Sequence, residues 1–342
     1  MIAGRTEVSI RDGLFLVNGV PTYQGRAWRG RPVSGLLLNA RLVQGIFDDL
    51  NPATRGLWKY PDTGAWDPDR NTAEFIAAMP EWRKHGLMAF TINLQGGMPK
   101  RHTESAQPWL NSAITADGDL RPEYLARLAS ILDRADQLGM AVILGVFYFG
   151  QDKRISAEAA VRRAVTLVTE WVVDSGRRNV LLEINNECNV TYGHKILQPD
   201  RVHELIMEAK GISRDGNRLL VSTSYGGGTI PGENVARAAD FLLLHGNGVD
   251  DQGRISEMVQ KTRLVPGCGN KPILFNEDDH YGFDRPVTNM SAAIESGASW
   301  GYYDQGDNDY RDGFQSPPVD WGISTGRKRA FFKAVREITG ET

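Results

Sequence analysis

The chain has 342 residues, of which 41% are hydrophobic and 24% are charged, the composition of a folded globular protein. Its formal net charge of −3 argues against a nucleic-acid or acidic-membrane partner. Two cysteines, Cys188 and Cys268, are too few for a disulfide framework. Residues 1–11 lack the apolar stretch of a signal peptide, so we expect a cytoplasmic protein, and a leader cleaved from a longer precursor stays open.

The N-terminal 20 residues are predicted to form a β-hairpin. Two strand-like runs, 7–10 and 14–17, are separated by Asp12-Gly13, and a second turn follows at Asn18-Gly19. Asp-Gly and Asn-Gly steps are typical of tight hairpin turns, because both residues of such a turn take a positive φ.

The next 50 residues are the hardest part of the chain to interpret. We place a first barrel strand near residues 21–28 and treat residues 29–70 as a long loop that follows it. This loop carries Trp58, Tyr60 and Trp66, and we expect these rings to wall one end of a substrate site.

From residue 72 onward, apolar strand-like segments alternate with amphipathic helix-like segments. The predicted strands cover residues 87–93, 140–148, 179–185, 218–224, 240–245, 272–276 and 298–303. The predicted helices cover residues 72–85, 122–138, 157–174, 200–209, 234–239, 255–264, 287–295 and 328–338. Gly86 and Gly139 directly follow two of these helices, where a left-handed cap is expected.

This alternation predicts a parallel sheet covered by helices. With the strand near residues 21–28 it gives eight βα units, so we expect one (β/α)8 TIM barrel over residues 1–342, with the N-terminal hairpin closing its bottom. A doubly wound open sheet is the alternative. It usually binds a nucleotide through G-x-G-x-x-G or a P-loop, and neither pattern occurs in the chain.

Active sites of (β/α)8 barrels lie at the C-terminal ends of the strands, so the residues at those positions are the candidate site. They form a polar and aromatic set with two carboxylates, namely Asn93, Gln95, Tyr148, Asn186, Glu187, Tyr225, His245, Asn247, Glu277, Trp300, Tyr302 and Tyr303. Two facing carboxylates can divide acid and base roles, as glycosidic bond cleavage requires. Aromatic rings suit the apolar faces of sugars, although Trp300 could equally be part of the core.

Two segments resemble the catalytic strands of clan A glycoside hydrolases, the group that includes family five cellulases and mannanases. Residues 183–189, E-I-N-N-E-C-N, resemble the fourth-strand motif E-I-x-N-E-P-N, and residues 271–277, K-P-I-L-F-N-E, resemble the seventh-strand motif K-P-I/V-x-x-x-E. Residues 13–21, G-L-F-L-V-N-G-V-P, are similar to the start of many members. The resemblance extends over the chain in the order of its elements.

The resemblance implies a role for several strand-end residues. Glu187 would be the acid/base, Asn186 would bind the hydroxyl next to the anomeric carbon, and Glu277 would be the nucleophile. Trp300 would be the clan's eighth-strand tryptophan, and His245 falls where the clan often carries an aromatic residue or histidine. For this chemistry we expect Glu187 to be protonated and Glu277 to be ionised.

The chain departs from family five at several of these positions. Cys188 replaces a proline, and Asp278-Asp279-His280 replaces an aromatic-glycine pair. The second strand ends in Asn93 and Gln95 where family five has an arginine, and the third strand ends in Tyr148 where it has a histidine. We therefore expect a clan member outside family five.

The resulting hypothesis is a retaining glycoside hydrolase that cleaves oligosaccharides or small glycosides without a cofactor or metal. A transglycosylase with the same covalent intermediate, or a non-catalytic carbohydrate-binding barrel, remains an alternative. The G-x-S-x-G pattern at residues 297–301 follows a predicted helix and has no histidine after it, which argues against a serine hydrolase. The six histidines show no H-x-H or H-E-x-x-H spacing, which argues against a catalytic zinc. The sequence gives no indication of the oligomeric state.

Overall fold

The computed structural model describes residues 4–98, 107–306 and 310–341. The barrel strands are β6 (Asn39–Arg41), β7 (Ala89–Asn93), β8 (Ala141–Phe147), β9 (Val180–Asn185), β10 (Leu220–Ser222), β11 (Leu242–His245), β12 (Ile273–Glu277) and β13 (Gly301–Tyr302). The helices are α1 (Pro68–Lys84), α2 (Pro122–Leu138), α3 (Glu158–Asp174), α4 (Val202–Gly211), α5 (Glu233–Ala238), α6 (Gln252–Leu264), α7 (Asn289–Glu295) and α8 (Gly326–Thr339). Within the described residues, no helix is long and apolar enough to cross a membrane.

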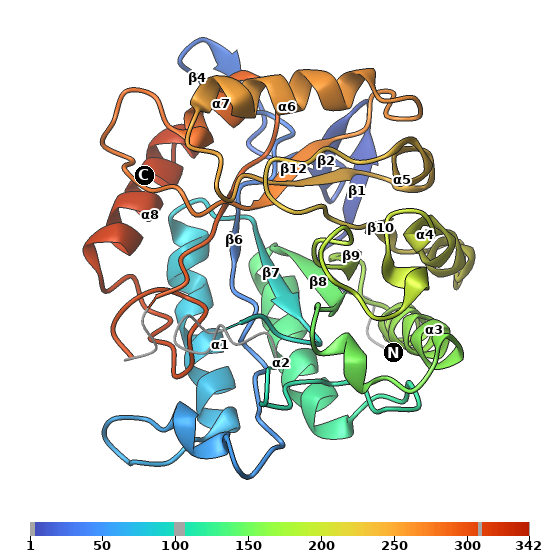
Figure 1. Cartoon of the computed structure of the whole chain (residues 1–342). Helices are drawn as coiled ribbons and strands as arrows, with labels where there is room; N and C mark the ends of the chain where they lie inside the picture. Colours follow the sequence, from blue (N-terminus) through green and yellow to red (C-terminus); the bar gives the residue numbers. More distant parts are fainter. Residues whose placement is uncertain (1–3, 99–106, 307–309, 342) are drawn as a thin grey trace.

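The strands close into a parallel barrel. Six of them pair in the order β10-β9-β8-β7-β6-β13, and β11 pairs with β12. Backbone hydrogen bonds join the two groups: the amide of Asp240 donates to Val221 O at 3.0 Å, and the amide of Ser299 donates to Ile273 O at 2.9 Å. The helices surround the strands as a ring in sequence order (Figure 1), so the predicted (β/α)8 fold is confirmed.

Helix α2 illustrates why these segments become helices of the outer ring. Pro122 occupies its first turn, where no intrahelical N–H partner is needed, and Gly139 ends it with a φ of 69°. Its buried side chains, including Leu128, Leu132 and Ala135, recur at three- and four-residue intervals and form one apolar face. That face packs on the barrel core.

The N-terminal hairpin closes the bottom of the barrel, as predicted. It consists of β1 (Val8–Arg11) and β2 (Leu14–Val17), followed by the short β3 (Val20–Pro21). Phe15 is fully buried, and its ring meets that of Phe241 edge-on with 6.0 Å between centroids. The same apolar cluster contains residues from the N-terminal ends of the barrel strands. The opposite end of the barrel is therefore the one that is available for a site.

The first barrel strand is not where we predicted it. Residues 21–28 lie outside the barrel and form part of the antiparallel pair β4 (Ala27–Trp28) and β5 (Arg31–Pro32), whereas the first barrel strand is Asn39–Arg41, inside the predicted loop. The strand is only three residues long, and two of these, Asn39 and Arg41, are polar groups that are buried, so the apolar run of a buried strand is interrupted.

The aromatic residues of the loop after β6 also differ from expectation. Trp58 and Tyr60 are fully buried and Trp66 is almost so. Together with Phe47 and Trp109 they form a small apolar cluster of their own. The rings pack on one another, with Phe47 meeting Trp58 at 5.1 Å between centroids, and so stabilise the loop instead of offering exposed faces to a substrate.

Candidate active site

Two glutamates and a histidine meet at the C-terminal end of the barrel. Glu187 follows β9, Glu277 is the last residue of β12, and His245 is the last residue of β11. One ligating atom from each of the three lies within 4.8 Å of the others. The side chains of Glu187 and Glu277 are 13% and 8% exposed, and that of His245 is fully buried. The chain thus gathers three titratable groups in a nearly closed space.

A strained turn presents the carboxylate of Glu187. Its φ is +53°, a left-handed conformation that is uncommon for residues other than glycine. The segment after β10 fixes the turn, because Ser224 accepts the amide of Glu187 through Oγ at 2.9 Å and the amide of Cys188 through its carbonyl at 2.8 Å. A proline at position 188 would lose the second bond, which gives a physical reason for the cysteine that replaces it.

A buried arginine and an amide hold the carboxylate of Glu277. Arg41, which is 1% exposed, places its Nε 2.7 Å from Oε2. Asn247 donates from Nδ2 to Oε1 at 2.6 Å. A permanent cation and an amide donor both favour the ionised form of a carboxyl group.

His245 lies between the two carboxylates and contacts both through the same nitrogen. Its Nδ1 is 2.9 Å from Oε1 of Glu187 and 3.6 Å from Oε2 of Glu277. Burial lowers the pKa of His245, but the charges of both glutamates and the hydrogen bond to Glu187 outweigh this effect and hold the pKa above its ordinary value.

The pKa shifts of the two glutamates run against our expectation for the acid and the nucleophile. Burial raises the pKa of Glu187, but the hydrogen bond and charge of His245, with the charge of Arg41, outweigh it and leave the pKa below its ordinary value. Burial also raises the pKa of Glu277, and Arg41 and His245 oppose that shift only in part. Because the three groups interact strongly, they titrate as a unit.

Comparison with solved structures identifies the same architecture in glycoside hydrolases. A glycoside hydrolase family 5 mannosidase from Rhizomucor miehei matches with a TM-score of 0.56 and 12% identity over 99% of both chains. A GH5-4 broad specificity endoglucanase from Bacteroides salanitronis matches with a TM-score of 0.56 and 13% identity, over 89% of this chain and 93% of that one. No protein-family model matches the sequence, and no curated protein matches it significantly.

The chain has the fold of family 5 glycoside hydrolases. A third structure of this kind, a xyloglucan-specific endo-β-1,4-glucanase of family 5 from a metagenomic library, was solved with cellotriose and matches with a TM-score of 0.55 and 11% identity over 88% of this chain and 96% of that one. These similarities give no support to our expectation of a clan member outside family 5. Identities this low establish the fold alone, so the activity has to be argued from the site.

Within the family 5 fold, several predicted site residues do gather around the carboxylates. Asn247 bonds to Glu277, and the phenols of Tyr148 and Tyr303 lie close enough to interact with its charge. Burial, reinforced by that charge, raises the pKa of both phenols, so they remain neutral. Asn186 is buried beside Glu187, and its Oδ1 has no hydrogen-bond partner among the described residues.

Two predicted site residues have structural roles instead. Trp300 is fully buried between the barrel and the helices, where its indole N–H donates to Asp278 at 2.9 Å and its ring packs near Phe283 and Phe331, so it offers no face to a sugar. The hydroxyl of Tyr225 accepts the amide of Gly232 at 3.2 Å and supports a loop. A short strand does not reveal from sequence which of its alternating faces points inward, so the sequence alone could not decide between the site and the core for Trp300.

The role of Asn93 stays a prediction. It ends β7 inside the barrel, where its side chain fills the space beside Gly145, and it is 2% exposed. Neither amide atom has a hydrogen-bond partner among the described residues.

Sequence reasoning missed Arg41 and Ser224. The second strand lacks the arginine that family five has there, and the arginine beside Glu277 comes from β6. The run 36–43, L-L-L-N-A-R-L-V, lies between two glycines and contains the signal of a buried strand, but its Asn and Arg obscure that signal. Ser224 acts through a hydrogen bond to backbone, for which no sequence pattern exists.

Two trios of potential metal ligands lie in the described ranges, the one just described and Asp278, Asp279 and His280. In the first, the guanidinium of Arg41 already lies 2.7 Å from Glu277 and would repel a cation. In the second, Nδ1 of His280 bonds to Asp278, and the hydrogen bonds and charges of the aspartates raise the pKa of the ring to about 9, which favours the protonated form that has no free lone pair. We assign neither trio to a metal.

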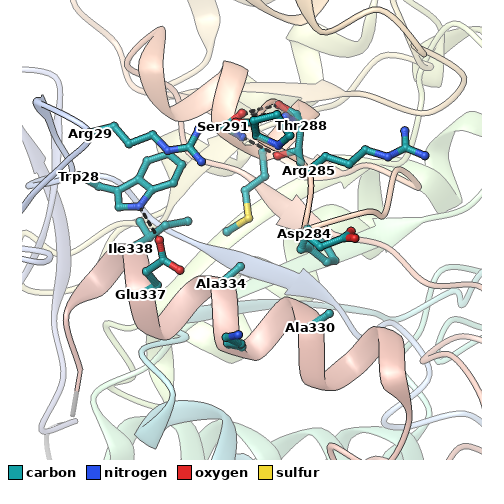
Figure 2. Close-up of a pocket in the computed structure, with 14 residues that line it drawn as sticks. Trp28, Arg29, Asp284, Arg285, Thr288, Ser291, Ala330, Ala334, Glu337 and Ile338 are labelled. Carbon is teal, nitrogen blue, oxygen red and sulfur yellow. Dashed lines mark hydrogen bonds between the residues drawn. The ribbon is translucent and has the colours of Figure 1, made fainter.

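A separate pocket of about 540 Å³ lies outside the barrel, between the β4–β5 pair, the segment before α7, and α8. Figure 2 shows that Trp28 and Arg29 stand at one side of this pocket, and Trp28 donates from its indole to Glu337 at 3.4 Å. None of the residues that line the pocket is a candidate catalytic group. Its size therefore carries no argument about the chemistry at the strand ends.

Proposed function

We propose that the protein is a retaining glycoside hydrolase in which Glu277 is the nucleophile and Glu187 is the acid/base. The observation that supports this most directly is the approach of the two carboxylates at the ends of β9 and β12, with oxygens within 4.8 Å of each other. Direct attack on the anomeric carbon needs carboxyl groups about 5–5.5 Å apart, whereas an inverting enzyme leaves room for water at about 6.5–9.5 Å.

The contacts of each glutamate suit one of the two roles. Arg41 and Asn247 both favour an ionised Glu277, which can attack the anomeric carbon and form a glycosyl ester. Glu187 stands opposite with a hydrogen bond to His245 and protonates the oxygen that leaves. In the second step Glu187 takes a proton from water, which attacks the ester and releases the sugar with its configuration retained.

The proposed substrates are oligosaccharides or small glycosides, and the proposed location is the cytoplasm. The low exposure of both carboxylates favours a substrate whose reacting bond enters a narrow opening. Asn186, with its unpartnered buried Oδ1, would accept a hydroxyl of the sugar bound there. A transglycosylase would use the same ester, so the fate of that ester must be measured.

The test is a panel of aryl glycosides that covers the common sugars in both anomeric configurations, with the first-formed product read by proton NMR. We expect hydrolysis of at least one glycoside with retention, and no turnover by Glu277→Gln. The matched control is Glu233→Gln, a change on the exposed face of α5, which should leave the rate unchanged. Inversion, or activity in Glu277→Gln, would refute the proposal. Transfer to an added sugar acceptor would identify a transglycosylase.

A further inference from the structure

The position of His245 raises the question of where the catalytic proton resides before substrate is cleaved. A single ring nitrogen lies 2.9 Å from one catalytic carboxylate and 3.6 Å from the other. The ring is fully buried, which disfavours its charged form, so the charges of the neighbouring groups decide whether it holds a proton. A histidine in this place can act as a third member of the acid-base site.

The groups that face His245 favour a charged ring. The two catalytic glutamates contribute negative charge, and Arg41 is the permanent cation beside Glu277. Deeper in the barrel, Glu183 is buried, accepts a bond from Asn276 at 3.2 Å and interacts with Arg41. Arg41 alone does not balance the charges of Glu187 and Glu277, which favours one further proton on the ring or on one of the two carboxyl groups.

Imidazole is the most basic of the groups that can take this proton, with an ordinary pKa about 2 units above that of a glutamate. A proton on Nδ1 of the ring contacts both carboxylates, whereas a proton on Glu187 would leave a buried Glu277 with less compensation. The other ring nitrogen, Nε2, has no hydrogen-bond partner among the described residues. The phenols of Tyr148 and Tyr303 remain neutral and do not compete for it.

We propose that His245 holds the catalytic proton in the resting site and passes it to Glu187 as Glu187 protonates the leaving oxygen. His245 is then a positioning residue: it holds the proton and acts on the substrate only through Glu187. The raised pKa of His245 and the lowered pKa of Glu187 agree with this location. The proposal rests on the proposed function for its kinetic part, but not for the location of the proton.

The transfer balances without any further reactant. In the first step Nδ1 of His245 gives its proton to Glu187, and Glu187 passes it to the glycosidic oxygen as the C–O bond breaks and Glu277 forms the glycosyl ester. Glu187 is then again a carboxylate, beside a neutral imidazole. The net change is one proton from His245 to the leaving group. In the second step water adds to the anomeric carbon, and its proton passes through Glu187 back to His245 while Glu277 regains its charge.

The location of the proton can be read by 15N NMR of histidine-labelled protein, with the His245→Gln spectrum used for assignment. We expect both ring nitrogens of His245 to be protonated at pH 7, and the midpoint of its titration to fall by about 1 unit or more in Glu277→Gln, because an opposite charge within a few ångströms is lost. His203→Gln, on α4, is the control and should change only its own signal. A neutral His245 ring at pH 7 in the wild-type protein would overturn the proposal, whatever the activity.

The kinetic part is tested with a glycoside that the wild-type enzyme hydrolyses. In His245→Gln we expect the alkaline limb of the kcat/KM profile to move to lower pH by about 1–2 units, since Glu187 must then hold the proton alone. The loss of kcat should be greater for poor leaving groups than for activated ones. An unmoved alkaline limb in a folded variant would overturn the relay. If no glycoside is hydrolysed at all, the proposed function fails, while the NMR result still decides the location of the proton.

Discussion

At the level of single residues, Arg41 is the charge that most strongly opposes the raised pKa of Glu277. It is the permanent cation at Glu277, and it is buried with its partner. Burial raises the pKa of Glu277 and Arg41 opposes that shift, so the arginine keeps this carboxyl group ionised at lower pH than burial alone would allow.

Replacing Arg41 by methionine should therefore have two measurable effects. The acid limb of the pH–rate profile should move to higher pH, because the pKa of Glu277 rises further when the opposing charge is lost. The free energy of unfolding should fall by about 3–5 kcal/mol, the usual cost of breaking a buried ion pair. Arg163→Met, which removes an exposed pair with Asp119, is the control and should cost about 1 kcal/mol or less. An unchanged acid limb would show that Arg41 does not set the charge of Glu277.

The sequence predicted some of these residues and not others, for reasons that differ. Glu187 and Glu277 were predicted because each lies at the C-terminal end of a clearly apolar, buried strand. Arg41 was missed because its strand is short and polar. The contact of His245 with both carboxylates depends on the irregular register between β11 and β12, where His245 pairs with Glu277, and no spacing in the sequence encodes that register.

At the level of elements, helices were predicted more closely than strands. The predicted helix 122–138 coincides with α2. Pro122 and Gly139 mark its ends, and its apolar residues recur with helical periodicity over enough residues to predict a helix. The strand predicted at residues 298–303 is only Gly301–Tyr302 in the structure. Two residues are too few to predict which side chains face the barrel interior and which face the helices. As a result Trp300 was predicted in the site. Its indole N–H instead donates to Asp278, which links the residue before β13 to the residue after β12.

This structural role gives a direct prediction for Trp300→Ala. The variant should lose about 3–5 kcal/mol of stability, because a large buried side chain is removed and Asp278 loses a hydrogen bond. Thermal unfolding measures the change, and KM of the folded enzyme should stay close to the wild-type value. Trp171→Ala, which truncates a partly buried ring on α3, should cost less. A normal unfolding temperature combined with a raised KM would instead restore the sugar-binding interpretation.

At the level of the whole molecule, the hairpin closes one end of the barrel, and the three titratable groups of the candidate site lie at the other end. Phe15 seals the bottom against Phe241, far along the chain, so the N-terminal segment contributes to the same folded unit as the later strands. We therefore keep the prediction that residues 1–342 form one catalytic domain.

A single domain should unfold in one cooperative transition. In calorimetry we expect the calorimetric and van't Hoff enthalpies to agree, and Phe15→Ala to lower the free energy of unfolding by about 3–5 kcal/mol without splitting the transition. Val20→Ala, at an exposed position nearby, is the control and should have little effect. Two separated transitions would show that the hairpin or another segment folds independently.

The central claim, that Glu277 attacks and Glu187 serves as acid/base, is tested most directly by azide rescue. In Glu187→Ala the first step still proceeds with an activated aryl glycoside, because such a leaving group needs little protonation, and azide then enters the space that the carboxylate vacated. The account predicts that azide speeds turnover of Glu187→Ala and yields a glycosyl azide with the configuration of the substrate. An azide of inverted configuration from this variant would contradict it, because Glu187 would then be the nucleophile.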